Sequence, residues 1–229
     1  MQIFSRMLSV AGVLALVPLI ASAQPLGKIV ITPYAGVYAP VNDIAKANIP
    51  DGSFSIAGKA EHKLGFALGA TGSYWLTPRY GFEVGGLYAW SDLKTAISST
   101  QQGDFESNET ENAGVIFGTA KFMVALFPQT SDFQLRLGAG PAIITRRGSA
   151  YKDPDGTVTG KTDFGGAVSL CTKIPLVSGM ALRMRAEDYM YQAKLGFKDR
   201  VDPADNITFD KKFQHDFVFS VGLQIGLMR

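Results

Sequence analysis

The stretch from Asp216 to Arg229, DFVFSVGLQIGLMR, constrains the fold more than any other part of the sequence. Large apolar side chains occupy every second position, at Phe217, Phe219, Val221, Leu223, Ile225 and Leu227. Apart from Val218, the positions between them hold small or polar residues. This alternation is the pattern of a β-strand with one apolar face. Such a strand buries that face in a soluble core, or turns it toward lipid in a membrane barrel.

The first 23 residues have the three parts of a signal peptide. Arg6 supplies a positive charge, Met7–Ile20 is apolar, and Ala21-Ser22-Ala23 forms a small-residue cleavage site before Gln24. The apolar run is shorter than the roughly 20 residues that a spanning helix needs. We therefore predict a signal peptide at 1–23 and a single domain at 24–229. No later segment is apolar throughout, so any insertion into a membrane must be by strands.

Eight segments of the mature chain alternate in this way, each close to the 9–11 residues of a tilted membrane strand or somewhat longer. They are Lys28–Pro40, Leu64–Leu76, Tyr80–Lys94, Asn112–Phe127, Phe133–Arg146, Thr162–Leu176, Met180–Ala193 and Asp216–Arg229. The facing of the first segment is left open, because its alternation is loose. The closing segment is expected to pair with the first and so to remove the free edges of the sheet.

The connections between these segments alternate in length. Long polar loops are predicted at Asn42–Lys63, Thr95–Glu111, Arg147–Lys161 and Lys194–Lys212. Short turns are predicted at Thr77–Arg79, Pro128–Asp132 and Val177–Gly179. Outer-membrane barrels have short periplasmic turns and longer extracellular loops. The alternation therefore predicts a membrane barrel whose four polar loops lie outside the cell.

Charged residues of the strands share the face opposite the apolar one. They are Glu83, Lys121, Arg136, Lys173, Arg183, Arg185 and Glu187. In a membrane barrel this face is the lumen, where charges must pair, and its many Gly and Ala residues suit a narrow interior. We therefore predict a lumen charge network.

Aromatic residues near the strand ends predict two girdles, one at each membrane interface. Tyr74, Trp75, Tyr80, Phe127 and Phe133 lie near the turns, and Tyr88, Trp90 and Tyr191 lie near the loops.

The chain resembles the small outer-membrane β-barrels related to the OmpA transmembrane domain and OmpX. The resemblance rests on the signal peptide, the eight alternating segments, TPRYGFEVGGLYAW after a tight turn, and VFSVGLQIGL at the close. It implies an all-β, eight-stranded antiparallel up-and-down transmembrane barrel in the outer membrane, inserted by the barrel-assembly machinery. The family usually ends on an aromatic residue that this machinery reads, whereas this chain ends Leu227-Met228-Arg229.

The sequence contains no recognisable catalytic motif. His62 and His215 are the only histidines, and neither belongs to a nucleophile–base–acid pattern. One cysteine and two separated histidines cannot form a usual zinc shell, and no cofactor is expected. The chain has 22 Lys and Arg against 20 Asp and Glu, which gives no support to nucleic-acid binding.

We therefore expect a non-enzymatic, monomeric outer-membrane barrel in contact with the membrane lipids. Its role would be structural, or would consist of surface interactions through four extracellular loops. Two alternatives stay open at this stage. The barrel could be a narrow channel, or the same alternation could belong to a secreted soluble, lipocalin-like barrel with an apolar pocket.

Overall fold

Antiparallel strands make up nearly all of the described chain. The computed structural model describes residues 29–41, 45–51, 54–99, 105–127, 133–151, 162–177, 179–193 and 213–228. Its strands are β1 (Ile29–Pro40), β2 (Ala45–Asp51), β3 (Phe54–His62), β4 (Gly65–Trp75), β5 (Tyr80–Ser99), β6 (Phe105–Ala125), β7 (Gln134–Arg147), β8 (Thr162–Val177), β9 (Met180–Gln192) and β10 (Phe213–Met228). A short 3-10 helix, η1, covers Ser149–Tyr151. None of the described residues belongs to a helix long and apolar enough to cross a membrane. The predicted signal peptide lies outside the described residues.

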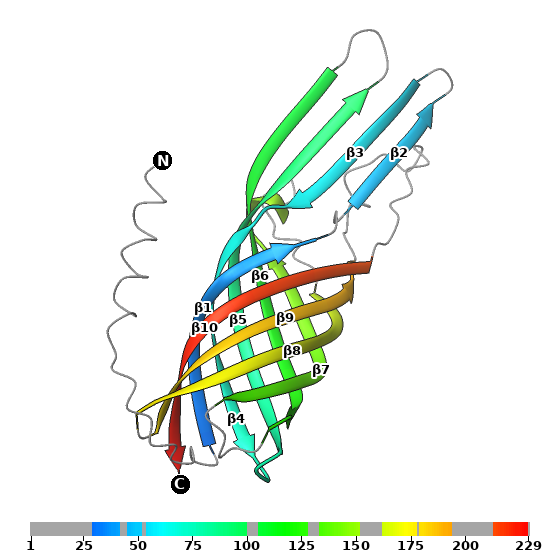
Figure 1. Cartoon of the computed structure of the whole chain (residues 1–229). Helices are drawn as coiled ribbons and strands as arrows, with labels where there is room; N and C mark the ends of the chain where they lie inside the picture. Colours follow the sequence, from blue (N-terminus) through cyan, green and yellow to red (C-terminus); the bar gives the residue numbers. More distant parts are fainter. Residues whose placement is uncertain are drawn as a thin grey trace, which may run out of the picture.

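Eight of these strands close into a barrel. Around it they follow the order β5-β4-β1-β10-β9-β8-β7-β6, and β6 pairs back onto β5 (Figure 1). β1 and β10 pair in antiparallel fashion from Ile29↔Met228 to Pro40↔Asp216, as the sequence predicted. Because this pairing removes both edges of the sheet, the strand hydrogen bonds are satisfied inside the wall. The predicted fold class, an eight-stranded antiparallel up-and-down barrel, is confirmed.

Two of the predicted loops contain regular strands, which corrects the sequence interpretation. The segment 42–63 holds the β2–β3 hairpin, and β3 in turn pairs with β5. β5 and β6 continue through most of 95–111 and stay paired up to Ser99↔Phe105. These strands rise beyond one end of the barrel (Figure 1). Backbone pairing needs no apolar face, and the polar, Gly- and Ala-containing sequence there shows no alternation for a pattern search to find.

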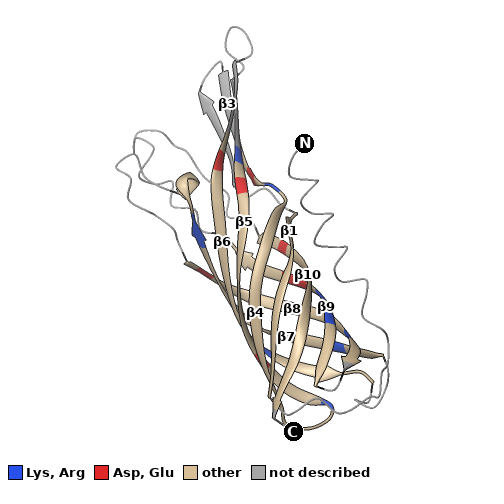
Figure 2. Ribbon diagram, turned by 90° about the vertical axis from the view of Figure 1, so that its left-hand side faces the viewer, with Lys and Arg blue, Asp and Glu red and all other residues tan. Residues whose placement is uncertain are grey.

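The apolar face of every barrel strand points outward. On β10, Phe219 is 54% exposed and Val221 is 44% exposed, whereas Ser220 and Gln224 are buried. The same holds around the barrel, with exposed apolar residues that include Phe82, Val84, Phe122, Leu137, Ile143, Phe164, Leu170 and Met184. Charged positions are scattered along the barrel strands (Figure 2), and Glu83, Lys121 and Arg183 among them have buried side chains. An apolar surface this extensive belongs in lipid. The alternative of a soluble barrel with an apolar pocket is incompatible with it.

Exposed aromatic rings gather near both ends of the barrel wall. Tyr80 stacks on Phe122 near the short turns, which define the turn end of the barrel. Phe66 stacks on Trp90 toward the opposite, loop end. Rings at these two levels suit the two interfaces of a membrane. Two predicted girdle members are wrong, because Trp75 and Tyr191 are 6% and 2% exposed and point inward. Successive residues of a strand face opposite sides. Because the residues next to Trp75 and Tyr191 face outward, these two side chains point into the lumen.

Candidate functional site in the barrel lumen

Five charged side chains meet in the middle of the lumen and form the central ion network: Glu83, Lys121, Arg183, Arg185 and Glu187. Glu83 accepts from Arg183 Nη1 at 2.5 Å, and its other oxygen lies 3.2 Å from Lys121 Nζ and 3.4 Å from Arg185 Nη2. Glu187 pairs with Lys121 and lies 3.2 Å from Arg185 Nη1. The network joins β5 and β6 to β9 across the barrel.

Neutral side chains extend the central ion network around the wall. The Ser73 hydroxyl donates to Glu83 at 3.0 Å, and the Tyr189 hydroxyl donates to Glu187 at 3.3 Å. Arg185 donates to Thr71 Oγ1 at 3.0 Å, and its guanidinium lies 4.8 Å from the centroid of the Tyr34 ring. These contacts form because β1, β4 and β9 present the residues on their inward face. Together they satisfy charges that would otherwise be costly to bury.

Two of the seven residues predicted for the lumen network lie apart from it. Arg136 and Lys173 are 2% and 5% exposed, so they do face the lumen. Neither forms an ion pair with any carboxylate among the described residues. They lie toward the turn end, where the Arg136 guanidinium contacts the Trp75 ring and the amides of Gln134 and Gln224.

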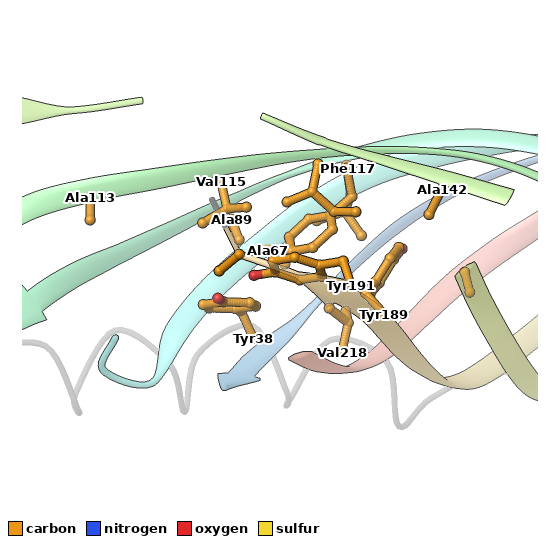
Figure 3. Packing of buried hydrophobic residues seen from close by; sticks show 14 of the residues in the cluster. Tyr38, Ala67, Ala89, Ala113, Val115, Phe117, Ala142, Tyr189, Tyr191 and Val218 are labelled. Atoms are coloured by element: carbon orange, nitrogen blue, oxygen red, sulfur yellow. The ribbon is translucent and has the colours of Figure 1, made fainter. Parts of the chain in front are cut away.

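The loop end of the lumen is filled by an aromatic layer that consists of Tyr38, Phe117, Tyr189 and Tyr191. The Phe117 and Tyr189 rings are 4.2 Å apart between centroids, and Tyr38 lies 5.9 Å from Phe117. These rings pack among small side chains such as Ala67 and Ala89 (Figure 3). The aromatic layer lies on the loop side of the central ion network, so buried side chains occupy two successive levels of the lumen. An eight-stranded barrel has just enough interior for this.

Sequence reasoning missed three charged residues that line the same end of the lumen. Arg146 Nη1 pairs with Asp163 Oδ2 at 2.6 Å, and the Tyr191 hydroxyl donates to Asp216 at 2.6 Å. All three are at most 2% exposed. The alternation along the strands did indicate their facing. Arg146 lies an even number of residues from Arg136 on β7, and Asp163 lies an even number of residues from Lys173 on β8, so each pair shares the inward face. These residues were overlooked because they stand at or near strand ends, next to the polar loops.

The two histidines lie on opposite sides of the barrel wall. His62 is buried beside the Tyr38 and Tyr151 rings, and its Nε2 lies 2.6 Å from the Tyr151 hydroxyl. Burial lowers the pKa of His62 to about 3, and the nearby Arg146 guanidinium acts in the same direction. His62 is therefore neutral and can accept this hydrogen bond. His215 faces outward and lies 2.9 Å from Asp188.

The lumen groups are arranged to pair with one another. The described residues contain no group of three His, Cys, Asp or Glu side chains that could hold a metal ion. The thiol of Cys171 is buried and accepts from Arg183 Nη2 at 3.1 Å. Each carboxylate of the central ion network already contacts at least two cations. Because both carboxylates are already paired with cations, this arrangement favours a structural role for the interior over acid–base chemistry.

Comparison with solved structures agrees with this fold. The outer membrane protein OprG from Pseudomonas aeruginosa superposes with a TM-score of 0.58 at 14% identity, over 90% of this chain and 98% of that chain. Neisserial surface protein A superposes with a TM-score of 0.52 at 12% identity, over 89% of this chain and 100% of that chain. The sequence matches no protein-family model and no curated protein.

The closed barrel, its lipid-facing apolar band and these structural neighbours define the class of protein. The chain is a transmembrane β-barrel of the outer-membrane type. It resides in the outer membrane of a Gram-negative envelope, with its apolar band in the lipid and its charges in the lumen.

Proposed function

We propose that this protein is a closed, monomeric and non-enzymatic outer-membrane barrel that acts through the parts extending outside the membrane. The observation that carries the proposal is that the central ion network and the aromatic layer occupy successive levels of the lumen. Side chains at two levels of so narrow a barrel oppose passage through it, and this favours the surface as the place of action.

The extension of β3, β5 and β6 supports a surface role. These strands pair with one another beyond the barrel, from Ile56↔Ser99 through His62↔Leu93, and β5 pairs with β6 over the same height. A paired extension of this kind is a stiffer platform than a free loop, because its backbone groups are held in a ladder. Polar strands outside the membrane suit either a structural role in the envelope or contact with molecules outside the cell.

Planar bilayer recording tests the closed lumen. We expect bilayers containing the purified protein to remain electrically silent, because side chains of opposite charge bridge the barrel interior. Heat-modifiable gel migration of the protein recovered from the vesicles verifies that it was folded and inserted. Stepwise conductance from such a preparation would contradict the proposal and favour the narrow-channel alternative.

Cysteine labelling on intact cells tests which end is outside. We expect a membrane-impermeant maleimide to label Ser149→Cys, because Ser149 is exposed at the loop end. Arg79→Cys, in the exposed turn between β4 and β5, is the matched variant and should label only after the outer membrane is permeabilised. The native Cys171 is 1% exposed and should stay unlabelled in both cases. Labelling of Arg79→Cys alone on intact cells would reverse the orientation and remove the surface role.

A further inference from the structure

The turn end of the lumen contains a group of buried N–H donors that have no acceptor among the described residues. They are Nε of Arg136, the side-chain nitrogen of Gln224 and the indole nitrogen of Trp75. The three side chains come from β7, β10 and β4 and are 2%, 0% and 6% exposed. A buried donor without an acceptor loses its hydrogen bond to water and receives nothing in return.

These donors belong to side chains in mutual contact. Arg136 Nη1 lies 3.4 Å from the Gln224 side-chain oxygen, and the guanidinium carbon lies 4.4 Å from the centroid of the Trp75 ring. Arg136 Nη2 also donates to Gln134 Oε1 at 2.9 Å. Both amides therefore present their oxygens to Arg136, and the Gln224 nitrogen stays unpartnered next to the cation.

A second cation stands beside this group. Lys173 lies opposite Gln134 in the β7–β8 ladder and opposite Arg183 in the β8–β9 ladder. It is 5% exposed, and no hydrogen bond or ion pair holds it within the described residues. The nearest lumen carboxylates, Glu83 and Glu187, are already engaged by Lys121, Arg183 and Arg185. Within the described residues, neither Arg136 nor Lys173 forms an ion pair with a carboxylate, so the turn end of the lumen carries two buried cations without a direct counter-charge.

We propose that Arg136, Lys173, Gln224 and Trp75 form a binding site for a small inorganic anion, such as a halide or phosphate. An anion beside Arg136 would supply the acceptor that these donors lack and would offset the positive charge of Arg136 and Lys173, whereas a cation would be repelled. Water could satisfy the donors but would leave both charges uncompensated. The site is independent of the surface role, because it lies in the lumen at the opposite end of the barrel from the extended strands.

Anion exchange at constant ionic strength tests this site. The folded barrel in detergent is moved from sodium gluconate, whose anion is large, into increasing sodium bromide, and thermal unfolding is followed by circular dichroism. We expect a saturable rise in the unfolding midpoint, because an anion that binds only the folded state stabilises it. Sodium phosphate in place of bromide distinguishes a halide site from an oxyanion site.

Variants assign the effect to named residues. Arg136→Gln and Lys173→Gln should each raise the half-saturating bromide concentration by about tenfold, because each loses one charge-assisted interaction. Arg79→Gln is the matched control, since it removes an exposed cation at the same end of the barrel and should leave the bromide response unchanged.

Diffraction from wild-type crystals grown with bromide provides a second measurement that does not depend on the variants folding. An anomalous peak beside the Arg136 guanidinium is the expected result. A wild-type midpoint that responds identically to gluconate, bromide and phosphate, together with no peak in the lower lumen, would overturn the proposal in favour of water.

Discussion

Replacing Glu83 by glutamine should lower the free energy of unfolding by about 3–5 kcal/mol, the cost of removing one partner from a buried ion pair. Glu83 is 1% exposed and contacts Lys121, Arg183 and Arg185. Its loss would leave these three cations to share the single carboxylate of Glu187, so that buried positive charges repel one another. The decrease can be measured by urea unfolding of the barrel in detergent, followed by tryptophan fluorescence.

Two further variants make this result specific to the central ion network. Glu111→Gln removes an exposed carboxylate on β6 and should change stability by less than about 0.5 kcal/mol. The exchanged pair Glu83→Lys with Lys121→Glu should not recover the loss, although the two positions lie opposite each other in the β5–β6 ladder, because a lysine at position 83 would face Arg183 and Arg185 and a glutamate at position 121 would face Glu187. If Glu83→Gln is as stable as Glu111→Gln, the central ion network contributes nothing to folding.

Placing an arginine on the outer face of β10 should also be strongly destabilising. Val221 lies near the middle of β10 and is 44% exposed, so its side chain faces the hydrocarbon of the bilayer. Arginine at the midplane of a barrel wall costs about 2–4 kcal/mol, and the cost falls to about 0–1 kcal/mol near the interfaces. We therefore expect Val221→Arg to lower the free energy of unfolding in lipid vesicles by the larger amount.

Leu227→Arg is the matched substitution, because Leu227 shares the outward face of β10 but lies beside the turn end. Unfolding of both variants by guanidinium in the presence of vesicles gives the comparison. The larger cost at Val221 is the signature of a depth-dependent lipid environment. Equal and small costs for the two variants would indicate that the apolar band contacts water, which is incompatible with a membrane barrel.

The positions of most barrel strands can be predicted from the alternation of apolar and polar residues alone. The predicted segments match the observed strands within one to three residues at β1, β4, β7, β8, β9 and β10. The prediction worked because lipid requires apolar residues on one face of a strand and the lumen favours small or polar residues on the other, so the alternation indicates which residues face outward. It failed at β2, β3 and the upper parts of β5 and β6, where the chain leaves the membrane and that constraint ends.

The sequence by itself determined the facing of most strand residues, because facing depends on position along a strand, although it placed Trp75 and Tyr191 on the wrong face. It could not determine which of those side chains meet. Glu83 and Arg183 are 100 residues apart in sequence, yet their charged atoms lie 2.5 Å apart across the barrel. Arg136 shares their parity but stands at another height, beside Trp75 and two amides instead of a carboxylate. Height in the lumen is set by strand tilt and register, which only the closed tertiary structure decides.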